Sequence, residues 1–153
     1  MNMNATIYVK SLLISPELEM FTGATIEINH MPGIGLHVVG MPDAKVKETL
    51  LRVITGLQAL GYHIPGEKII INIAYDLPAY TDRNAFRWEL LDYAIALGLM
   101  RVLGTPCHTG KYYVGEMALD GTIRQLRPDD LRVIMEHYAI EAPVYGSRTL
   151  EAK

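Results

Sequence analysis

The sequence predicts a single α/β domain in which strands and amphipathic helices follow one another along the chain. Its 153 residues suffice for one domain with a sizeable core, and half of them are hydrophobic while a fifth are charged. β-Branched runs near the N-terminus indicate strands, and a long stretch of helical periodicity follows them. We interpret residues 1–153 as one domain, with a C-terminal helix and tail from about residue 129.

Four segments in the first half of the chain are predicted to be strands. Residues 7–14 and 24–30 are rich in β-branched side chains, and a Pro-Gly turn separates the second of them from residues 34–39. Residues 68–73 form a short, nearly continuous apolar run. Such a run is typical of a central strand, so this strand is expected to be buried on both faces.

The segment after residue 40 gives the clearest helical signal. Pro42 suits the first turn of a helix, Asp43 complements the positive end of the helix dipole, and Gly61 is the expected C-cap. Apolar residues at helical spacing predict one buried face, and four charged residues lie outside it. The apolar face comprises Val46, Leu50, Val53, Ile54, Leu57 and Leu60, and the charged residues are Lys45, Lys47, Glu48 and Arg52.

A second helix is predicted before residue 104. Its apolar positions run from Phe86 to about Leu103, and Asp82 and Asn84 in the polar loop before it are candidate N-caps.

A hairpin and a last helix are predicted to follow. Asp120-Gly121 is a two-residue turn of the kind that closes a tight β-hairpin, here between residues 112–119 and 122–126. The last helix is predicted over residues 128–138, with Pro128 in its first turn and two aspartates at its positive end.

Composition argues against several classes of protein. The net charge of −3 does not provide the positive field expected of a free-standing nucleic-acid-binding protein. No apolar run is long enough to span a bilayer, and the first residues do not resemble a signal peptide, so a cytoplasmic location is expected. Cys107 is the only cysteine, which agrees with a reducing compartment and allows no internal disulfide.

Three separated blocks of the sequence resemble one known family. The block MPGIGLHVVGMPDAKVKETLLRVITGLQALGYHIPGEKIIINIAYDLP, residues 31–78, is similar to the N-terminal domain of the magnesium-chelatase-related, ComM-type (YifB) proteins. LLDYAIALGLM resembles the second helix of that domain, with Asp92 at its usual acidic position. VGEMALDGTIRQLRP resembles a hairpin that the family shares with Lon proteases. The resemblance covers roughly residues 6–130.

The resemblance implies a fold like that of domain 2 of ribosomal protein S5, with helices packed on one face of a mixed sheet. In this family the Lon-protease-like domain precedes a hexamer-forming AAA+ ATPase, and ComM-type members are associated with DNA uptake and branch migration. The implied partners are therefore an AAA+ ATPase, in cis if the natural chain is longer and otherwise in trans, and DNA. A homo-oligomer is also implied, and no membrane is expected.

The chain departs from the family pattern in two places. The loop between Pro78 and Asp92 is longer than usual and lacks a Gly-rich Lys-Glu-Gly motif, reading AYTDRNAFRWELL instead. The chain also ends before an ATPase of this kind would begin.

A Lon-type peptidase needs a serine nucleophile at the start of the second helix and a neutral lysine base after the hairpin. The only serines are Ser11, Ser15 and Ser147, so none lies near the second helix. No lysine occurs between Lys111 and Lys153. Both members of the dyad are missing, and we expect no catalytic residue of this type.

ATP binding by a phosphate-binding loop would require G-x-x-x-x-G-K-[ST] between a strand and a helix. The nearest approach is GTPCHTGKY, residues 104–112, which has one residue too many between its glycines and Tyr112 in place of the hydroxyl. We expect this segment to connect a helix to a strand and the chain to bind no nucleotide or other cofactor.

The sequence gives little support for a metal site or for an acid–base catalytic pair. No two histidine or cysteine positions show zinc-site spacing, so no metal site is expected. Four carboxylates gather around one loop and helix start, where helix capping and dipole compensation explain most of them, and an acid–base pair stays open as an alternative. The histidine and cysteine positions are His30, His37, His63, Cys107, His108 and His137. The four carboxylates are Asp76, Asp82, Glu89 and Asp92.

The remaining candidate is an interaction groove. Arg83, Arg87 and Trp88 lie in or just after the enlarged loop, and Arg124 and Arg127 lie on or after the second hairpin strand. The Lon-like resemblance implies that these two regions face each other across the former active-site groove. Arginine beside an exposed aromatic ring suits anionic or protein partners. The alternative is a solvated charged rim with Trp88 in the core.

Three functions follow from these observations. The leading one is a non-catalytic binding or assembly module that acts with an AAA+ ATPase, possible roles being DNA processing or competence. The second is a nucleic-acid-binding accessory domain, which the acidic net charge disfavours. The third is an enzyme with an unfamiliar carboxylate site, which predicts an acidic pocket that contains a carboxyl of raised pKa.

Overall fold

The fold is an α+β arrangement, as predicted. It is known from a computed structural model that describes residues 5–107, 110–134, 140–143 and 147–153. The elements in chain order are β1 (Ile7–Ser15), β2 (Met20–Met31), β3 (Gly35–Val39), α1 (Asp43–Ala59), β4 (Lys68–Tyr75), the 3-10 turns η1 (Arg83–Ala85) and η2 (Trp88–Leu91), α2 (Asp92–Val102), β5 (Tyr112–Tyr113), β6 (Thr122–Ile123), α3 (Pro128–Ile134), β7 (Ile140–Glu141) and β8 (Arg148–Thr149).

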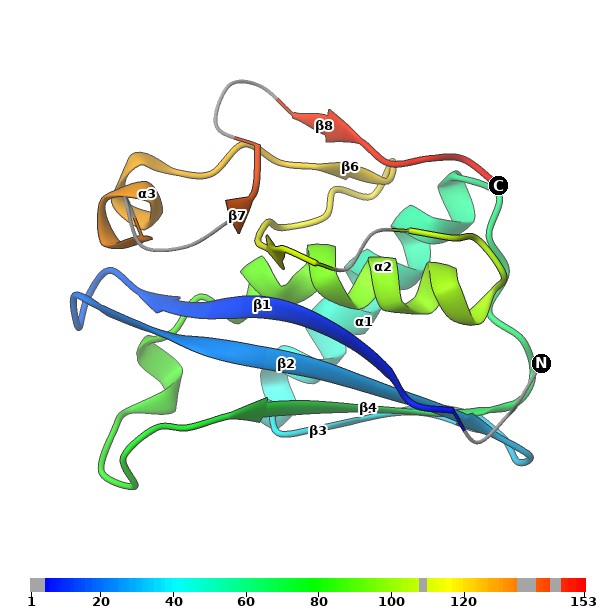
Figure 1. The fold of residues 1–153 in the computed structure, drawn as a ribbon, viewed down its shortest axis with the longest axis horizontal. Coiled ribbons are helices and arrows are strands. Elements are labelled where there is room, and N and C mark those ends of the chain that lie inside the picture. The colour runs from blue at the N-terminus through cyan, green and yellow to red at the C-terminus, as the bar shows by residue number, and fades with distance from the viewer. Residues whose placement is uncertain (1–4, 108–109, 135–139, 144–146) are drawn as a thin grey trace.

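The main sheet is mixed, which confirms the prediction. Its strands lie in the order β3-β4-β2-β1-β5-β7 (Figure 1). β1 pairs antiparallel with β2, and β2 with β4, whereas β3 runs parallel to β4. A parallel pair needs a crossover connection, which α1 supplies. β6 and β8 form a separate two-stranded sheet near the C-terminal end.

The two long helices, α1 and α2, pack together against one face of this sheet. Val53 and Leu57 of α1 share the main core with alternate side chains of β1, β2 and β4. Of the eleven residues of α2, all but Arg101 are buried. α2 is therefore the central element of the molecule, and its apolar run reflects burial on every side.

The prediction that residues 68–73 are buried on both faces is wrong. Ile69, Ile71 and Ile73 are buried beneath the helices, but Ile70 and Asn72 on the opposite face are only half-buried. β4 is a strand of a sheet whose long helices lie on one side, so isoleucine on its second face reflects β-propensity rather than a second covering layer.

The short helix α3 belongs to a second, smaller apolar cluster. Its Ile134 and Leu131 pack with Leu12 and Ile14 of β1. Neighbouring side chains of a strand point to opposite faces, so this cluster lies on the face of β1 away from Leu13 and the main core. The predicted end of this helix, residues 135–138, lies outside the described residues.

The second long helix begins later than predicted. The apolar positions between Phe86 and Leu91 lie in and beside the turn η2, and α2 begins only at Asp92. Asp82 does act as a cap, but of the turn η1: its Oδ1 accepts a hydrogen bond from the Asn84 N–H at 3.0 Å.

The hairpin is shorter than predicted. Tyr112 and Tyr113 pair with β1 and β7 in the main sheet rather than with the second hairpin strand. Met117 forms a bridge with Ile123, the Ala118 N–H donates to the Thr122 carbonyl, and the Arg124 N–H donates to the Glu116 carbonyl. The turn contains residues 119–121 rather than two residues, because Gly121 adopts a φ of 91° that forms a glycine bulge.

Gly61 ends α1 as predicted, although it is the residue after the C-cap, which is Leu60. Gly61 has a φ of 92°, and its N–H donates to the Gln58 carbonyl, while the next N–H, of Tyr62, donates to the Leu57 carbonyl. This is the usual way in which glycine ends a helix. No helix in the described part of the chain is both long and apolar enough to span a membrane.

Candidate functional site

A small, charged hollow of about 100 Å³ lies between η2, the hairpin and α3. Three of the predicted arginines, Arg87, Arg124 and Arg127, meet there. The whole lining consists of Arg87, Glu89, Leu90, Glu116, Arg124, Gln125, Leu126, Arg127 and Asp130, and these residues are called the charged groove below.

Two of the predicted residues lie elsewhere. Trp88 is fully buried in the main core, as the alternative interpretation predicted, so it presents no exposed ring to a partner. Its Nε1–H donates to the Arg83 carbonyl at 2.7 Å, and its ring meets that of Tyr75 edge-on at 5.6 Å. Arg83 stacks above the Tyr75 ring and donates from Nε to the Tyr75 hydroxyl at 3.3 Å. Neither side chain lines the groove.

The arginines of the groove alternate with carboxylates. Arg87 Nε lies 3.2 Å from Asp130 Oδ1, and Arg87 Nη1 lies 3.7 Å from Glu89 Oε1. Arg124 Nε lies 3.7 Å from Glu116 Oε1. Burial raises the pKa of Asp130, while Arg87 and Arg127 lower it. Three arginines and three carboxylates make the groove formally neutral.

A buried ion pair anchors the hairpin that carries part of this groove. Asp92 is fully buried and accepts two hydrogen bonds from Arg52 of α1, from Nε at 2.7 Å and from Nη2 at 3.2 Å. The same carboxylate accepts a third from the Met117 N–H at 3.0 Å. Asp92 thus ties α1 and α2 to the residue next to Glu116, and it does not line the charged groove.

The four carboxylates that the sequence grouped together have separate partners. Asp82 caps η1, Glu89 faces Arg87 and Asp92 pairs with Arg52, while Asp76 is exposed. Among the described residues, no group of three or more histidine, cysteine, aspartate or glutamate side chains could hold a metal ion.

Asp92 is expected to make stability depend on pH. Burial raises its pKa from the ordinary 3.8 to about 7, although Arg52 and the Met117 N–H oppose this. Between these two values the folded state binds the proton more tightly than the unfolded state. The free energy of unfolding should therefore fall as the pH rises from about 4 to 7, by at most about 1.4 kcal/mol per pH unit, and then level off.

The measurement compares urea unfolding of the wild type and of Asp92→Asn from pH 5 to pH 8. Asparagine does not titrate, so the difference between the two proteins isolates this carboxyl. The wild type should lose stability relative to the variant up to about pH 7. A difference that stays constant, or that grows in favour of the wild type, would show that the pKa of Asp92 is not raised.

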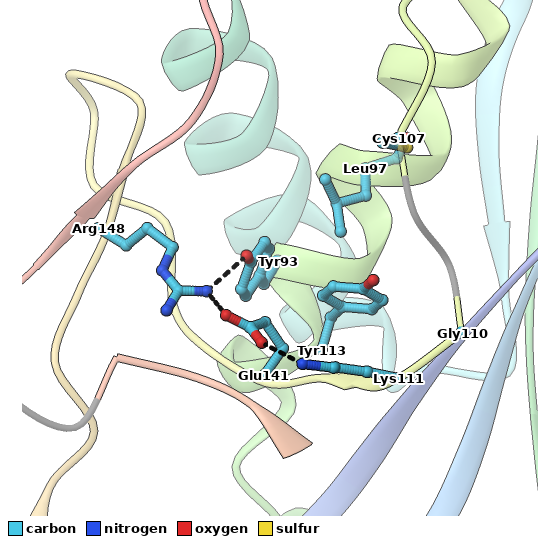
Figure 2. A pocket seen from close by; sticks show the side chains of 8 residues that line it. All are labelled: Tyr93, Leu97, Cys107, Gly110, Lys111, Tyr113, Glu141 and Arg148. Carbon is cyan, nitrogen blue, oxygen red and sulfur yellow. Dashed lines mark hydrogen bonds and ion pairs between the residues drawn. The ribbon is translucent and has the colours of Figure 1, made fainter. Parts of the chain in front are cut away.

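A larger cavity, of about 580 Å³, was not predicted from the sequence (Figure 2). It lies between α2, the described residues Cys107, Gly110 and Lys111 that follow it, and the C-terminal strands β7 and β8. Its lining residues are Tyr93, Leu97, Cys107, Gly110, Lys111, Tyr113, Glu141 and Arg148. These residues come from segments that are far apart in the chain. No pattern in the sequence indicates that these segments meet.

One part of the cavity lining is charged and another part is aromatic. Figure 2 shows Glu141 between Lys111 and Arg148: one carboxylate oxygen pairs with Lys111 Nζ at 3.2 Å and the other with Arg148 Nη1. Arg148 Nη1 also donates to the Tyr93 hydroxyl at 3.4 Å. The rings of Tyr93 and Tyr113 meet edge-on at 5.3 Å.

Cys107 lies toward the apolar end, beside Leu97 (Figure 2). Its Sγ–H donates to the Leu97 carbonyl at 3.4 Å, and burial raises the pKa of the thiol. The segment of residues 104–112 connects α2 to β5, as predicted, whereas a phosphate-binding loop connects a strand to a helix.

The chain is similar to two curated bacterial proteins. The chain is 37% identical over 102 residues to the uncharacterized protein YifB of Salmonella typhimurium and, equally, to that of Escherichia coli. Each match covers 65% of this chain but only 19% of the relative, so the chain spans about a fifth of the length of these proteins.

The family comparison covers more of the chain. The family described as subunit ChlI of Mg-chelatase matches residues 26–138, well over half of the sequence. This range contains both helices of the main core and every residue of the charged groove. The resemblance inferred from three sequence blocks is thus confirmed, and the chain belongs to the family of subunit ChlI of Mg-chelatase.

Proposed function

We propose that this chain is a non-catalytic binding module whose charged groove docks a protein partner. The observation that carries the proposal is the alternation of three arginines and three carboxylates along one hollow. Arg124 and Arg127 are exposed at its rim, and Arg127 has no ion pair within 4 Å among the described residues. Charged side chains of both signs that lack a close ion pair, or have only a long one, favour a protein partner whose surface carries the opposite charges at matching positions.

The partner that best fits the family is an AAA+ ATPase. The sequence resemblance implies that domains of this kind precede such an ATPase, and four-fifths of each YifB protein has no counterpart in this chain. The groove lies on the hairpin and α3, away from the β3 edge of the sheet. We infer that this surface attaches the module to the ATPase, in cis or in trans, and that the complex acts in the cytoplasm.

DNA is a weaker candidate. Affinity for a nucleic acid depends on lysine and arginine that neutralise phosphates, and each groove arginine here faces a carboxylate of opposite charge or lies close to one. The net charge of −3 adds repulsion at long range. Any role in DNA processing is therefore expected to come through the partner rather than through direct contact.

The test uses the Escherichia coli YifB protein without its matched region as the probe. The chain should bind this probe, and the double substitution Arg124→Ala/Arg127→Ala should weaken binding about tenfold by calorimetry. Lys47→Ala, an exposed cation on α1, is the matched control and should bind like the wild type. A short DNA duplex at low salt should not bind.

Three outcomes would count against the proposal: no binding to the probe, equal binding by the double variant, or salt-sensitive binding to the duplex. Light scattering after size exclusion, on the chain alone and with the probe, gives the stoichiometry. A complex with several chains per ring of the probe is expected, because the resemblance implies a hexameric ATPase.

A further inference from the structure

We propose that the larger cavity is a binding site for a small organic monoanion with an aromatic body. At about 580 Å³ it falls within the range of roughly 300–1,000 Å³ typical of small-molecule sites. It shares no residue with the charged groove, so this proposal does not depend on the docking function. Its two ends differ in chemistry, and each end selects one feature of the ligand.

The apolar end selects the aromatic body. Tyr93 and Tyr113 are nearly fully buried and hold each other in an edge-to-face arrangement. Leu97, on the turn of α2 after Tyr93, and the Cys107 thiol extend this wall (Figure 2). These side chains are fixed by packing before any ligand enters, so a planar ring can contact them at a low cost in entropy.

The polar end selects a single negative charge. Lys111 and Arg148 contribute two positive charges and Glu141 neutralises one of them, which leaves a net charge of +1. The Lys111 ammonium has three donors, and its one hydrogen bond to a described residue is to Glu141. Lys111 is 57% exposed at the cavity entrance and is free to turn toward a carboxylate. The net positive charge of this end, with Glu141 already paired to both Lys111 and Arg148, disfavours a cation.

Part of the cavity lies outside the region that the family comparison covers. Glu141 and Arg148 lie beyond residue 138, where the family match ends. A ligand that contacts both Tyr93 of α2 and Arg148 of β8 would also hold the C-terminal strands against the core. Binding should therefore raise the unfolding temperature, and above Kd the rise should grow with the logarithm of the ligand concentration.

The experiment uses Cys107, the only cysteine of the chain, as a reporter inside the cavity. The rate at which iodoacetamide alkylates its thiol is followed by mass spectrometry in the presence of 2-naphthoate or its neutral isostere 2-naphthamide. Naphthoate at about 1 mM should slow alkylation severalfold, and naphthamide should need about tenfold more. Lys111→Gln should abolish this preference but leave naphthamide protection unchanged.

Lys47→Gln, on the exposed side of α1, is the control and should keep the preference for naphthoate. Thermal shifts with both probes check that protection reflects binding to folded protein. No protection by either probe would overturn the site. Equal protection by the two probes, or a Lys111→Gln variant that still prefers naphthoate, would overturn its selection of an anion.

Discussion

Arg52→Met is expected to lower the free energy of unfolding by about 3–5 kcal/mol at pH 8. The substitution keeps an apolar stem on α1 but removes both hydrogen bonds that Arg52 donates to the buried Asp92 carboxylate, which keeps the one from the Met117 N–H. An uncompensated charge in the interior costs more than the pair itself contributes. Arg52 also lowers the pKa of Asp92, so its removal should raise that pKa further and make the loss smaller at pH 5, where the carboxyl is protonated.

Urea unfolding at both pH values measures this effect. Lys45→Met is the matched control, because Lys45 makes a partly exposed pair with Glu48 at 3.7 Å on the same helix, and such pairs contribute about 0–1 kcal/mol. The double variant Arg52→Met/Asp92→Asn should recover part of the stability, since both charges are then gone. A loss in Arg52→Met no larger than in Lys45→Met would refute the structural role assigned to the pair.

This ion pair shows what the sequence could not reveal. Arg52 was correctly placed outside the apolar stripe of α1, but its side chain is 20% exposed and reaches a partner forty positions away in the chain. Asp92 was expected to compensate a helix dipole, and it does stand at the first residue of α2. Nothing in the local pattern of either helix shows that the two faces meet.

The sequence predicted best those elements whose own residues determine them. β1, β3, α1 and β4 were predicted nearly at their observed bounds because each has its own periodicity and its own turn residues, whereas β2 begins four residues before its predicted start. The region after residue 103 was predicted less well. Tyr112 pairs with Lys10, about a hundred positions earlier, and β6 pairs with β8 rather than extending a hairpin. Such pairings depend on tertiary packing.

The same distinction applies to the candidate sites. The charged groove was found in part because its arginines lie in two segments that a family resemblance brings together. The cavity was missed because its polar end needs Glu141 and Arg148, in a stretch that gave no secondary-structure signal.

The buried pair of Arg52 and Asp92 also links the fold to the charged groove. Asp92 accepts a hydrogen bond from the Met117 N–H, and Met117 follows Glu116 of the groove. Loss of Arg52 should thus disturb partner docking as well as stability.

Trp88→Ala is expected to cost about 3–5 kcal/mol of unfolding free energy, the range for removal of a large buried aromatic side chain. Trp88 is fully buried among the main core residues and packs edge-on against Tyr75. Its loss leaves a cavity and leaves the Arg83 carbonyl without the indole donor. Guanidinium unfolding followed by circular dichroism measures the loss, because the single tryptophan is then absent.

The control for this prediction lies in the same enlarged loop. Tyr80 is 91% exposed, so Tyr80→Ala should change stability by no more than about 0.5 kcal/mol. In the wild type, the emission of Trp88 should be blue-shifted and poorly quenched by acrylamide, because water does not reach the ring. Efficient quenching, together with a loss of unfolding free energy in Trp88→Ala as small as that in Tyr80→Ala, would show that Trp88 is exposed at the surface. The charged groove would then have an aromatic anchor, and its partner would be recognised by stacking as well as by charge.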